Sequence, residues 1–208
     1  METDLVPKVS TADAARAGVI VEAAHRLFLA PGFARVSMDD LARELGMSKK
    51  TIYRYVPDRL SLLTAVLDRR FEAVERALAV AAEEGAGQAF EVRVQRFLIA
   101  AGTELGRIGA AQLSTGRGGD AALRRYVEQR VDAVIYAPLL ELFRHGHRQG
   151  LLPAPPELVG EITRGALERL LNSRLPYELE YSAADLLRAT VDTVLHGAIR
   201  PGGGGQGN

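Results

Sequence analysis

The sequence contains no cysteine, which excludes disulfide bonds, thiol nucleophiles and zinc sites with cysteine ligands. It also lacks net charge, because 26 Lys and Arg residues balance 26 Asp and Glu residues among its 208 residues. Any affinity for nucleic acid must therefore come from local clusters of basic residues. No apolar run approaches the roughly 20 residues that a membrane-spanning helix needs, and the polar N-terminus does not resemble a signal peptide. We expect a soluble, cytoplasmic protein without a membrane partner.

Strict alternation of polar and apolar residues is almost absent, and no Asn-Gly or Asp-Gly pair is present to close a β-hairpin. Apolar residues recur every three or four positions instead, which predicts an all-α fold of about nine helices. Pro138 interrupts one of these patterns and should kink or split that helix. The expected helices cover residues 11–30, 38–45, 49–55, 58–83, 90–105, 120–149, 156–174 and 183–200.

The lengths of these helices divide the chain into a small head and a larger body. Residues 11–57 form the expected three-helix head, and residues 58–200 form the helical body. Residues 1–10 should be a flexible N-terminus, and the Gly-rich tail 201–208 should be disordered because it has no side chains to bury.

Two short helices in the head are joined by a tight glycine turn, which is typical of a helix-turn-helix. Ser37 and Ser48 are the expected N-caps of these helices, and Gly46 can adopt the left-handed conformation that ends the first. Neither helix is long enough to be stable without packing against helix 11–30.

The segment "GMSKKTIYRYVPDR", residues 46–59, has four basic residues and one acid, a local charge of +3. Lys and Arg neutralise phosphates, and Tyr can meet a phosphate with its hydroxyl while its ring lies on a sugar or a thymine methyl. Two lysines alone would fit an ordinary solvated helix face. The glycine turn, the caps and the two exposed tyrosines favour a surface that contacts the major groove of DNA.

The segment "IVEAAHRLFLAPGFARVSMDDLARELGMSKKTIYRYVPDRLSLL", residues 20–63, resembles the DNA-binding domain of the TetR family of bacterial transcription regulators. The family pattern usually has Phe at Val56, Lys at Arg59 and a small residue at Lys50. The resemblance implies that Arg59 in place of Lys keeps a cation beside a phosphate, and that Val56 in place of Phe only reduces the packing under the helix. Lys50 places a long cation at the base-facing start of the recognition helix, so the bases read cannot be inferred from relatives.

The resemblance implies that hydroxyl and backbone groups of two serines meet phosphates, that the first turns of the recognition helix face the groove, and that its flanks hold the backbone. The implied DNA-contacting residues are Ser37, Ser48, Lys49, Lys50, Thr51, Tyr53, Arg54, Tyr55 and Arg59.

The resemblance further implies that the body binds a small molecule among its middle helices and dimerises through its last two. Polar groups beside apolar faces mark candidate pocket residues: Phe97, Ala101, Glu104, Arg107, Tyr126 and Arg130. Glu104 and Arg107 could equally be exposed and Tyr126 ordinary core. Apolar stripes mark candidate dimer contacts, although core packing predicts the same spacing: Ile162, Ala166, Leu170, Leu187, Val191 and Val194.

The sequence therefore predicts a ligand-responsive, homodimeric repressor whose partners are a palindromic DNA operator and a partly apolar effector. The alternative is a DNA-binding protein of the same fold without small-molecule control, which acts in chromosome organisation or through a protein partner. No catalytic motif is present, so we expect no enzyme activity and no cofactor. His145 and His147 lie two apart and would diverge on a helix, so no metal site is expected.

Overall fold

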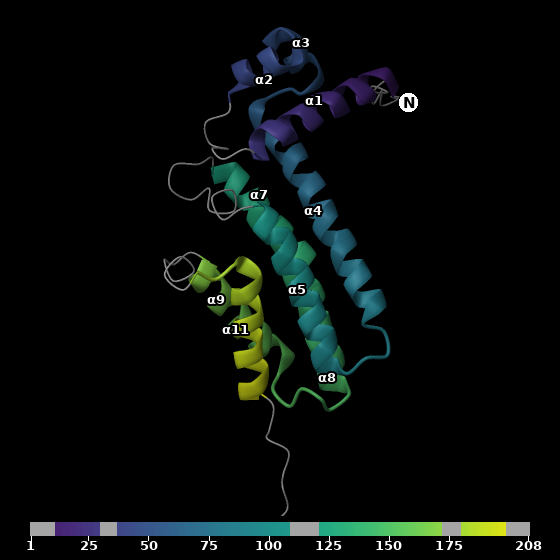
Figure 1. The fold of residues 1–208 in the computed structure, drawn as a ribbon, viewed down its shortest axis with the longest axis vertical. Helices are drawn as coiled ribbons and strands as arrows, with labels where there is room; N and C mark the ends of the chain where they lie inside the picture. The colour runs from purple at the N-terminus through teal and green to yellow at the C-terminus, as the bar shows by residue number, and fades with distance from the viewer. Residues whose placement is uncertain (1–10, 30–36, 109–120, 172–179, 199–208) are drawn as a thin grey trace, which may run out of the picture. The chain divides into compact units, whose positions relative to one another are not determined.

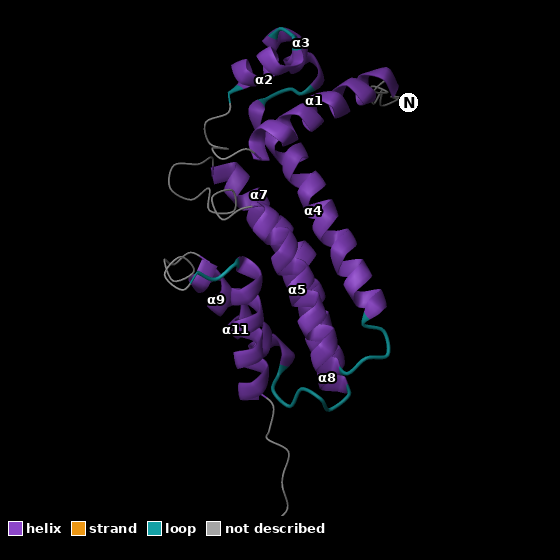
Figure 2. Ribbon diagram, viewed as in Figure 1, coloured by secondary structure: helices purple, strands orange, loops and turns teal. Residues whose placement is uncertain are grey.

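The computed structural model describes residues 11–29, 37–108, 121–171 and 180–198. The predicted flexible N-terminus, residues 1–10, and the predicted tail, residues 201–208, lie outside the described residues. Within the described ranges the chain forms helices joined by loops and turns, without a strand (Figure 2). The all-α prediction is confirmed. No described helix combines the length and apolar character that crossing a membrane would require.

The helices follow the predicted ranges closely (Figure 1). They are α1 (Thr11–Leu29), α2 (Met38–Leu45), α3 (Lys49–Tyr55), α4 (Arg59–Glu84), α5 (Phe90–Ile108), α7 (Ala121–Val131), α8 (Ala137–Arg148), α9 (Pro156–Leu171) and α11 (Ala183–Ala198), with a π-helix, η2 (Asp132–Tyr136), between α7 and α8.

The chain packs as two compact units that divide between Arg69 and Arg70. In the first unit, α1, α2 and α3 pack against one another. Ile20 of α1, Leu41 of α2 and Ile52 of α3 are fully buried, as is Leu62 in the first turns of α4. Each short helix thus buries at least one large apolar side chain, which supplies the packing that helices of this length need.

In the second unit, α11 packs on α5 and α9, and α8 packs on α5 and α9. Its largest fully buried side chains include Phe71, Leu98, Leu139 and Phe143. Gly146 of α8 is also buried, and it lies so close to Phe90 that a Cβ added there would come within 2.4 Å of the ring. The absence of a side chain at Gly146 therefore permits this close approach of α8 to the start of α5.

The helix predicted over residues 120–149 is interrupted next to Pro138, as its sequence indicates. Residues Asp132–Tyr136 form a π-helix, in which the Ala137 N–H bonds to the Asp132 carbonyl five residues back. Pro138 has no N–H to donate and sits in the first turn of α8, where a missing donor is tolerated. The π-helix is how this helix accommodates the proline without a sharp break.

Candidate nucleic-acid interface

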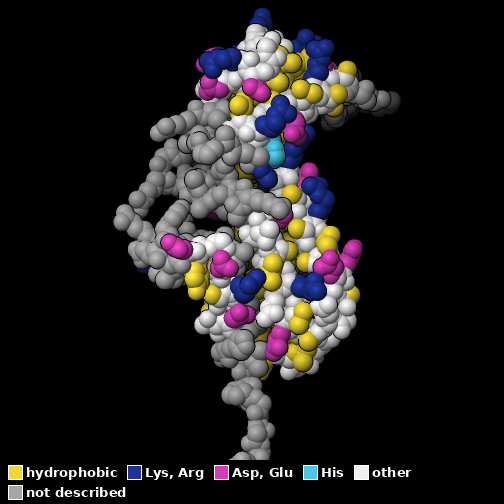
Figure 3. Space-filling model, viewed as in Figure 1, with side chains coloured by type: hydrophobic (Ala, Val, Ile, Leu, Met, Phe, Trp, Pro, Cys, Tyr) yellow, Lys and Arg dark blue, Asp and Glu magenta, His cyan; other side chains and the backbone are white. Residues whose placement is uncertain are grey.

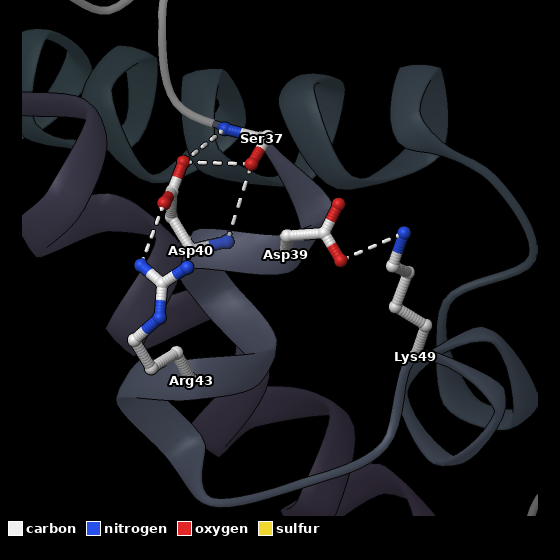
Figure 4. A network of polar contacts seen from close by, with 5 residues as sticks. All are labelled: Ser37, Asp39, Asp40, Arg43 and Lys49. Atoms are coloured by element: carbon white, nitrogen blue, oxygen red, sulfur yellow. Dashed lines mark hydrogen bonds and ion pairs between the residues drawn. The ribbon is translucent and has the colours of Figure 1, made fainter.

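The start of α2 is fixed by a reciprocal cap between Ser37 and Asp40 (Figure 4). The Asp40 N–H donates to Ser37 Oγ at 3.2 Å, while the Ser37 N–H and hydroxyl donate to Asp40 Oδ2 at 3.0 and 2.7 Å. The Ser37 hydroxyl bond, its backbone N–H bond and a bond from Arg43 lower the pKa of the Asp40 carboxyl. Both donors of Ser37 are thus engaged by Asp40, and a phosphate at Ser37 would have to displace that carboxylate.

The turn between α2 and α3 has the predicted form. Gly46 has a φ of 60°, in the left-handed region, and ends α2. Ser48 caps α3, since its Oγ accepts a hydrogen bond from the Thr51 N–H at 3.1 Å. These local bonds set the direction in which α3 leaves the turn.

One side of α3 is buried in the head, and the other side is an exposed polar surface. Ile52 is fully buried against the rest of the head, and Val56, which follows the helix, is 5% exposed. Thr51 and Tyr55 are half-buried. The exposed residues of this surface are Ser48, Lys49, Lys50, Tyr53 and Arg54.

Several of these side chains have partners within the head. Lys49 Nζ lies 2.7 Å from Oδ1 of Asp39 on α2. The Arg54 guanidinium lies 5.6 Å from the centre of the Tyr55 ring, and the Tyr55 hydroxyl accepts a hydrogen bond from Arg16 of α1 at 3.3 Å. Tyr55 therefore links α3 to α1 as well as lying at the edge of the polar surface.

The last predicted contact, Arg59, is exposed at the first position of α4. Asp58 precedes it and accepts a hydrogen bond from the Ser61 N–H at 2.7 Å, which lowers the pKa of its carboxyl. Figure 3 shows several Lys and Arg side chains at the end of the head that carries α2 and α3, with acidic side chains beside them. The head thus presents a mixed surface rather than a uniformly basic one.

A capped, anchored second helix with an exposed surface of basic and hydroxyl side chains is the arrangement of a helix-turn-helix. Residues 20–66 match the family model described as "Bacterial regulatory proteins, tetR family". The resemblance of this segment to the TetR family is therefore confirmed. No protein of curated function matches the chain in sequence.

Solved structures share the fold over most of the chain. A TetR/AcrR-family regulator from Thermobifida fusca is 23% identical, with a TM-score of 0.67, and the match covers 89% of this chain and 100% of that one. A transcriptional regulator from Saccharomonospora viridis in complex with choline is 20% identical, with a TM-score of 0.68 and coverage of 90% and 99%. The FadR repressor of Thermus thermophilus in complex with lauroyl-CoA is 18% identical, with a TM-score of 0.60 and coverage of 93% and 100%.

In the body, the predicted pocket residues lie on α5 and α7. Phe97 is 9% exposed and Ala101 is fully buried. Arg130 forms an ion pair with Glu75 at 3.3 Å, and its guanidinium lies 5.3 Å from the centre of the Phe71 ring. Glu104 and Tyr126 are half-buried and each has a polar or ring contact. The side chain of Arg107 lies outside the described residues.

A groove of about 420 Å³ lies elsewhere, between the last turns of α4 and the middle of α5. Its lining includes the exposed apolar side chains of Val80, Val92 and Ile99 and the ion pair of Arg96 with Glu84 at 2.8 Å. Helical geometry places this lining on the side of α5 opposite Phe97 and Ala101. The sequence did not single out this groove, because its apolar residues follow the same spacing as the core.

The predicted dimer residues are partly described. Ile162 is 51% exposed on α9, and Ala166 and Leu170 are half-buried there. On α11, Val194 is half-buried, while the side chains of Leu187 and Val191 lie outside the described residues. Leu158, one helical turn before Ile162, is also exposed, at 53%.

The π-helix carries a polar cluster that the sequence did not reveal. The Arg164 guanidinium of α9 lies 4.5 Å from the centre of the Tyr136 ring and forms ion pairs with Asp132 and, at 3.2 Å, with Glu168. Burial, followed by the nearby charges of Glu168 and Glu161, raises the pKa of Tyr136 to about 12. This cluster joins α9 to η2.

One of the two histidines near the end of α8, His147, contacts the turn that follows this helix. Its Nδ1 lies 2.7 Å from the Leu152 carbonyl oxygen, so the ring stabilises the turn after α8. Among the described residues, no three acidic, histidine or cysteine side chains are grouped closely enough to hold a metal ion.

Proposed function

We propose that the protein is a homodimeric transcriptional repressor that binds a palindromic operator through α3 and is released by a partly apolar small molecule. The proposal that DNA binds through α3 rests on the capping, burial and exposure of this helix. It is capped at Ser48, anchored by the buried Ile52, and exposes Lys49, Lys50 and Tyr53. A helix of this size fits the major groove, with its first turn nearest the base edges.

The proposed DNA contacts are the same residues that the sequence predicts, but the structure supports some of them more strongly than others. Lys50 and Tyr53 are exposed at the start and middle of α3 and are the best candidates for groove contacts. Arg54, Tyr55 and Arg59 would hold the backbone on the flanks. Ser37 is the weakest candidate, because Asp40 accepts from both of its donors.

Dimerisation through α9 and α11 is supported by the apolar surface of α9. Leu158 and Ile162 lie one turn apart and are more than half exposed, and a Cβ at Gly165 would meet nothing within 4 Å. A two-fold pair of heads reads two half-sites at a fixed separation, whereas one short head makes few contacts.

Sedimentation tests the dimer. Ile162→Glu should produce a monomer with weak operator binding, because the interface would bury an unpaired carboxylate. Val80→Glu changes an equally exposed apolar residue on α4 and serves as the matched control. A dimer that persists in Ile162→Glu would contradict the assignment of this face.

Effector control is supported by two fold neighbours, which were solved in complex with choline and with lauroyl-CoA. The energetic requirement is that the effector bind the DNA-free conformation better than the DNA-bound one. Choline and a series of acyl-CoAs are therefore the first compounds to test for thermal stabilisation and for release of operator DNA. If apolar compounds across a wide screen neither stabilise the protein nor release DNA, the alternative without small-molecule control is favoured.

The place of the effector is open to a direct test between two sites. Tyr126→Phe changes a residue of the predicted pocket, and Ile99→Asp changes the groove between α4 and α5. Loss of the response in only one of these variants assigns the site.

A further inference from the structure

Two neighbouring acids in the first turn of α2 have different partners (Figure 4). Asp40 faces Ser37 and Arg43 and completes the cap. Asp39 takes no part in the cap, and its carboxylate points toward the start of α3, where Oδ1 lies 2.7 Å from Lys49 Nζ. Asp39 is therefore not needed for the cap, although as an acid in the first turn it lies near the positive end of the α2 dipole.

The ion pair gives the two lysines that begin the recognition helix different electrostatic surroundings. Lys49 has its charge matched by Asp39, and the pKa of its ammonium group is raised by the hydrogen bond and charge of that carboxylate. Lys50 is exposed and forms no ion pair within the described part of the chain. Adjacent residues of the same type therefore present different net charge to a ligand.

Neither possible fate of the pair on DNA gives the full gain in affinity that a free lysine would give. If Lys49 stays with Asp39, the pair brings no net positive charge and releases no counterion from the phosphates. If Lys49 moves to a phosphate, the Asp39 carboxylate is left without its partner beside a polyanion. The pair is exposed, with side-chain exposures of 49% and 60%, and such pairs contribute little to stability.

We propose that Asp39 is an intramolecular competitor of the DNA backbone, which holds Lys49 in an ion pair, lowers the affinity of the head for any duplex and leaves Lys50 as the cation that selects the operator. This inference rests on the proposed binding of DNA through α3. It gives a neutral protein a way to limit non-specific binding, which depends on phosphate contacts, while keeping contacts to base edges.

The test is a fluorescence anisotropy titration of the full-length protein with a duplex of mixed sequence over a series of salt concentrations. Asp39→Asn removes the charge and keeps the size of the side chain. It should tighten binding several-fold and steepen the plot of log affinity against log salt by about 0.9, the change expected for one more phosphate contact. Glu44→Gln removes one exposed negative charge from the same helix and is the matched control, with a smaller effect expected on both quantities.

A double-mutant cycle identifies the partner. Lys49→Met should change the salt slope little in the wild-type protein, where Lys49 contacts no phosphate, although the exposed Asp39 carboxylate lowers the affinity itself. In the Asp39→Asn background it should lower the salt slope by about 0.9. Lys50→Met should weaken operator binding equally in both backgrounds. Circular dichroism melts of each variant identify any loss of binding that comes from unfolding.

Three results would overturn the inference: an unchanged salt slope in Asp39→Asn, an equal effect in Glu44→Gln, or an equal change of the salt slope by Lys49→Met in both backgrounds. Failure of the folded wild-type protein to bind any duplex would instead reject DNA binding through α3 itself. The two failures are therefore distinguishable.

Discussion

Substituting Gly146 by Ala tests the packing of the body at one contact. Inside a helix, Ala is ordinarily more stable than Gly by about 1 kcal/mol. At Gly146, however, the new Cβ would lie 2.4 Å from Cε2 and 2.5 Å from Cζ of Phe90. Phe90 is only 6% exposed at the first position of α5, so its ring cannot move freely into solvent. Overpacking of this kind costs about 1–3 kcal/mol, which equals or exceeds the gain in helix propensity.

Gly160→Ala on α9 provides the control, because the nearest atom to its Cβ is Leu140 Cδ1 at 3.5 Å, an ordinary contact. We expect Gly160→Ala to raise the free energy of unfolding by up to about 1 kcal/mol. Gly146→Ala should be less stable than Gly160→Ala by about 1–3 kcal/mol. Urea unfolding followed by circular dichroism measures both values.

A second variant separates the clash from other effects of the substitution. Phe90→Leu should restore part of the stability of Gly146→Ala while lowering that of the wild-type protein, giving a favourable coupling energy between the two positions. If Gly146→Ala is as stable as Gly160→Ala, or if Phe90→Leu restores nothing, the close packing of α8 on α5 is wrong.

Three further predictions concern polar groups. Ser37→Ala should destabilise the head by about 1 kcal/mol through loss of the α2 cap. Because the Ser37 hydrogen bonds lower the pKa of the Asp40 carboxyl below its ordinary 3.8, the part of the cap that depends on this carboxylate should be complete above that pH and should be lost as the pH falls through the lower folded value. The bond from the Asp40 N–H to Ser37 Oγ does not titrate and should remain. Thermal melts across acidic pH measure this partial loss. Tyr136 has a pKa raised from 10 to about 12, so wild-type stability relative to Tyr136→Phe should fall as pH rises above 10, and an unchanged difference would contradict the burial of its hydroxyl. Thr190→Val should stabilise the protein by about 1 kcal/mol, since the buried Thr190 hydroxyl has no hydrogen-bond partner among the described residues. Thr163→Val should not stabilise it, because the Thr163 hydroxyl donates to the Val159 carbonyl at 2.7 Å.

The local structure of the head could be predicted because its determinants are close in sequence. Ser37, Gly46 and Ser48 act within three or four residues of themselves, so their caps and turn follow from residue type and spacing. The interruption at Pro138 was predictable for the same reason. Its form as a π-helix was not, since that depends on which hydrogen bonds the rest of the helix can keep.

Contacts between helices could not be predicted in the same way. Asp39 and Lys49 are ten positions apart, and their ion pair depends on the angle between α2 and α3. The assignment of apolar faces in the body has the same limit. Phe97 and Ile99 both follow a helical spacing, yet one lies in the core and the other lines the groove.

The most direct measurement of the central claim is a selection of duplexes from a random-sequence pool by the full-length protein, followed by sequencing. Binding as a dimer through α3 predicts enrichment of two inverted half-sites separated by about one helical turn, 10 base pairs, or a multiple of it. The same selection with Lys50→Ala should relax the preference at particular positions in both half-sites. Absence of any symmetric motif, or an unchanged motif in Lys50→Ala, would contradict recognition of an operator through Lys50 of α3.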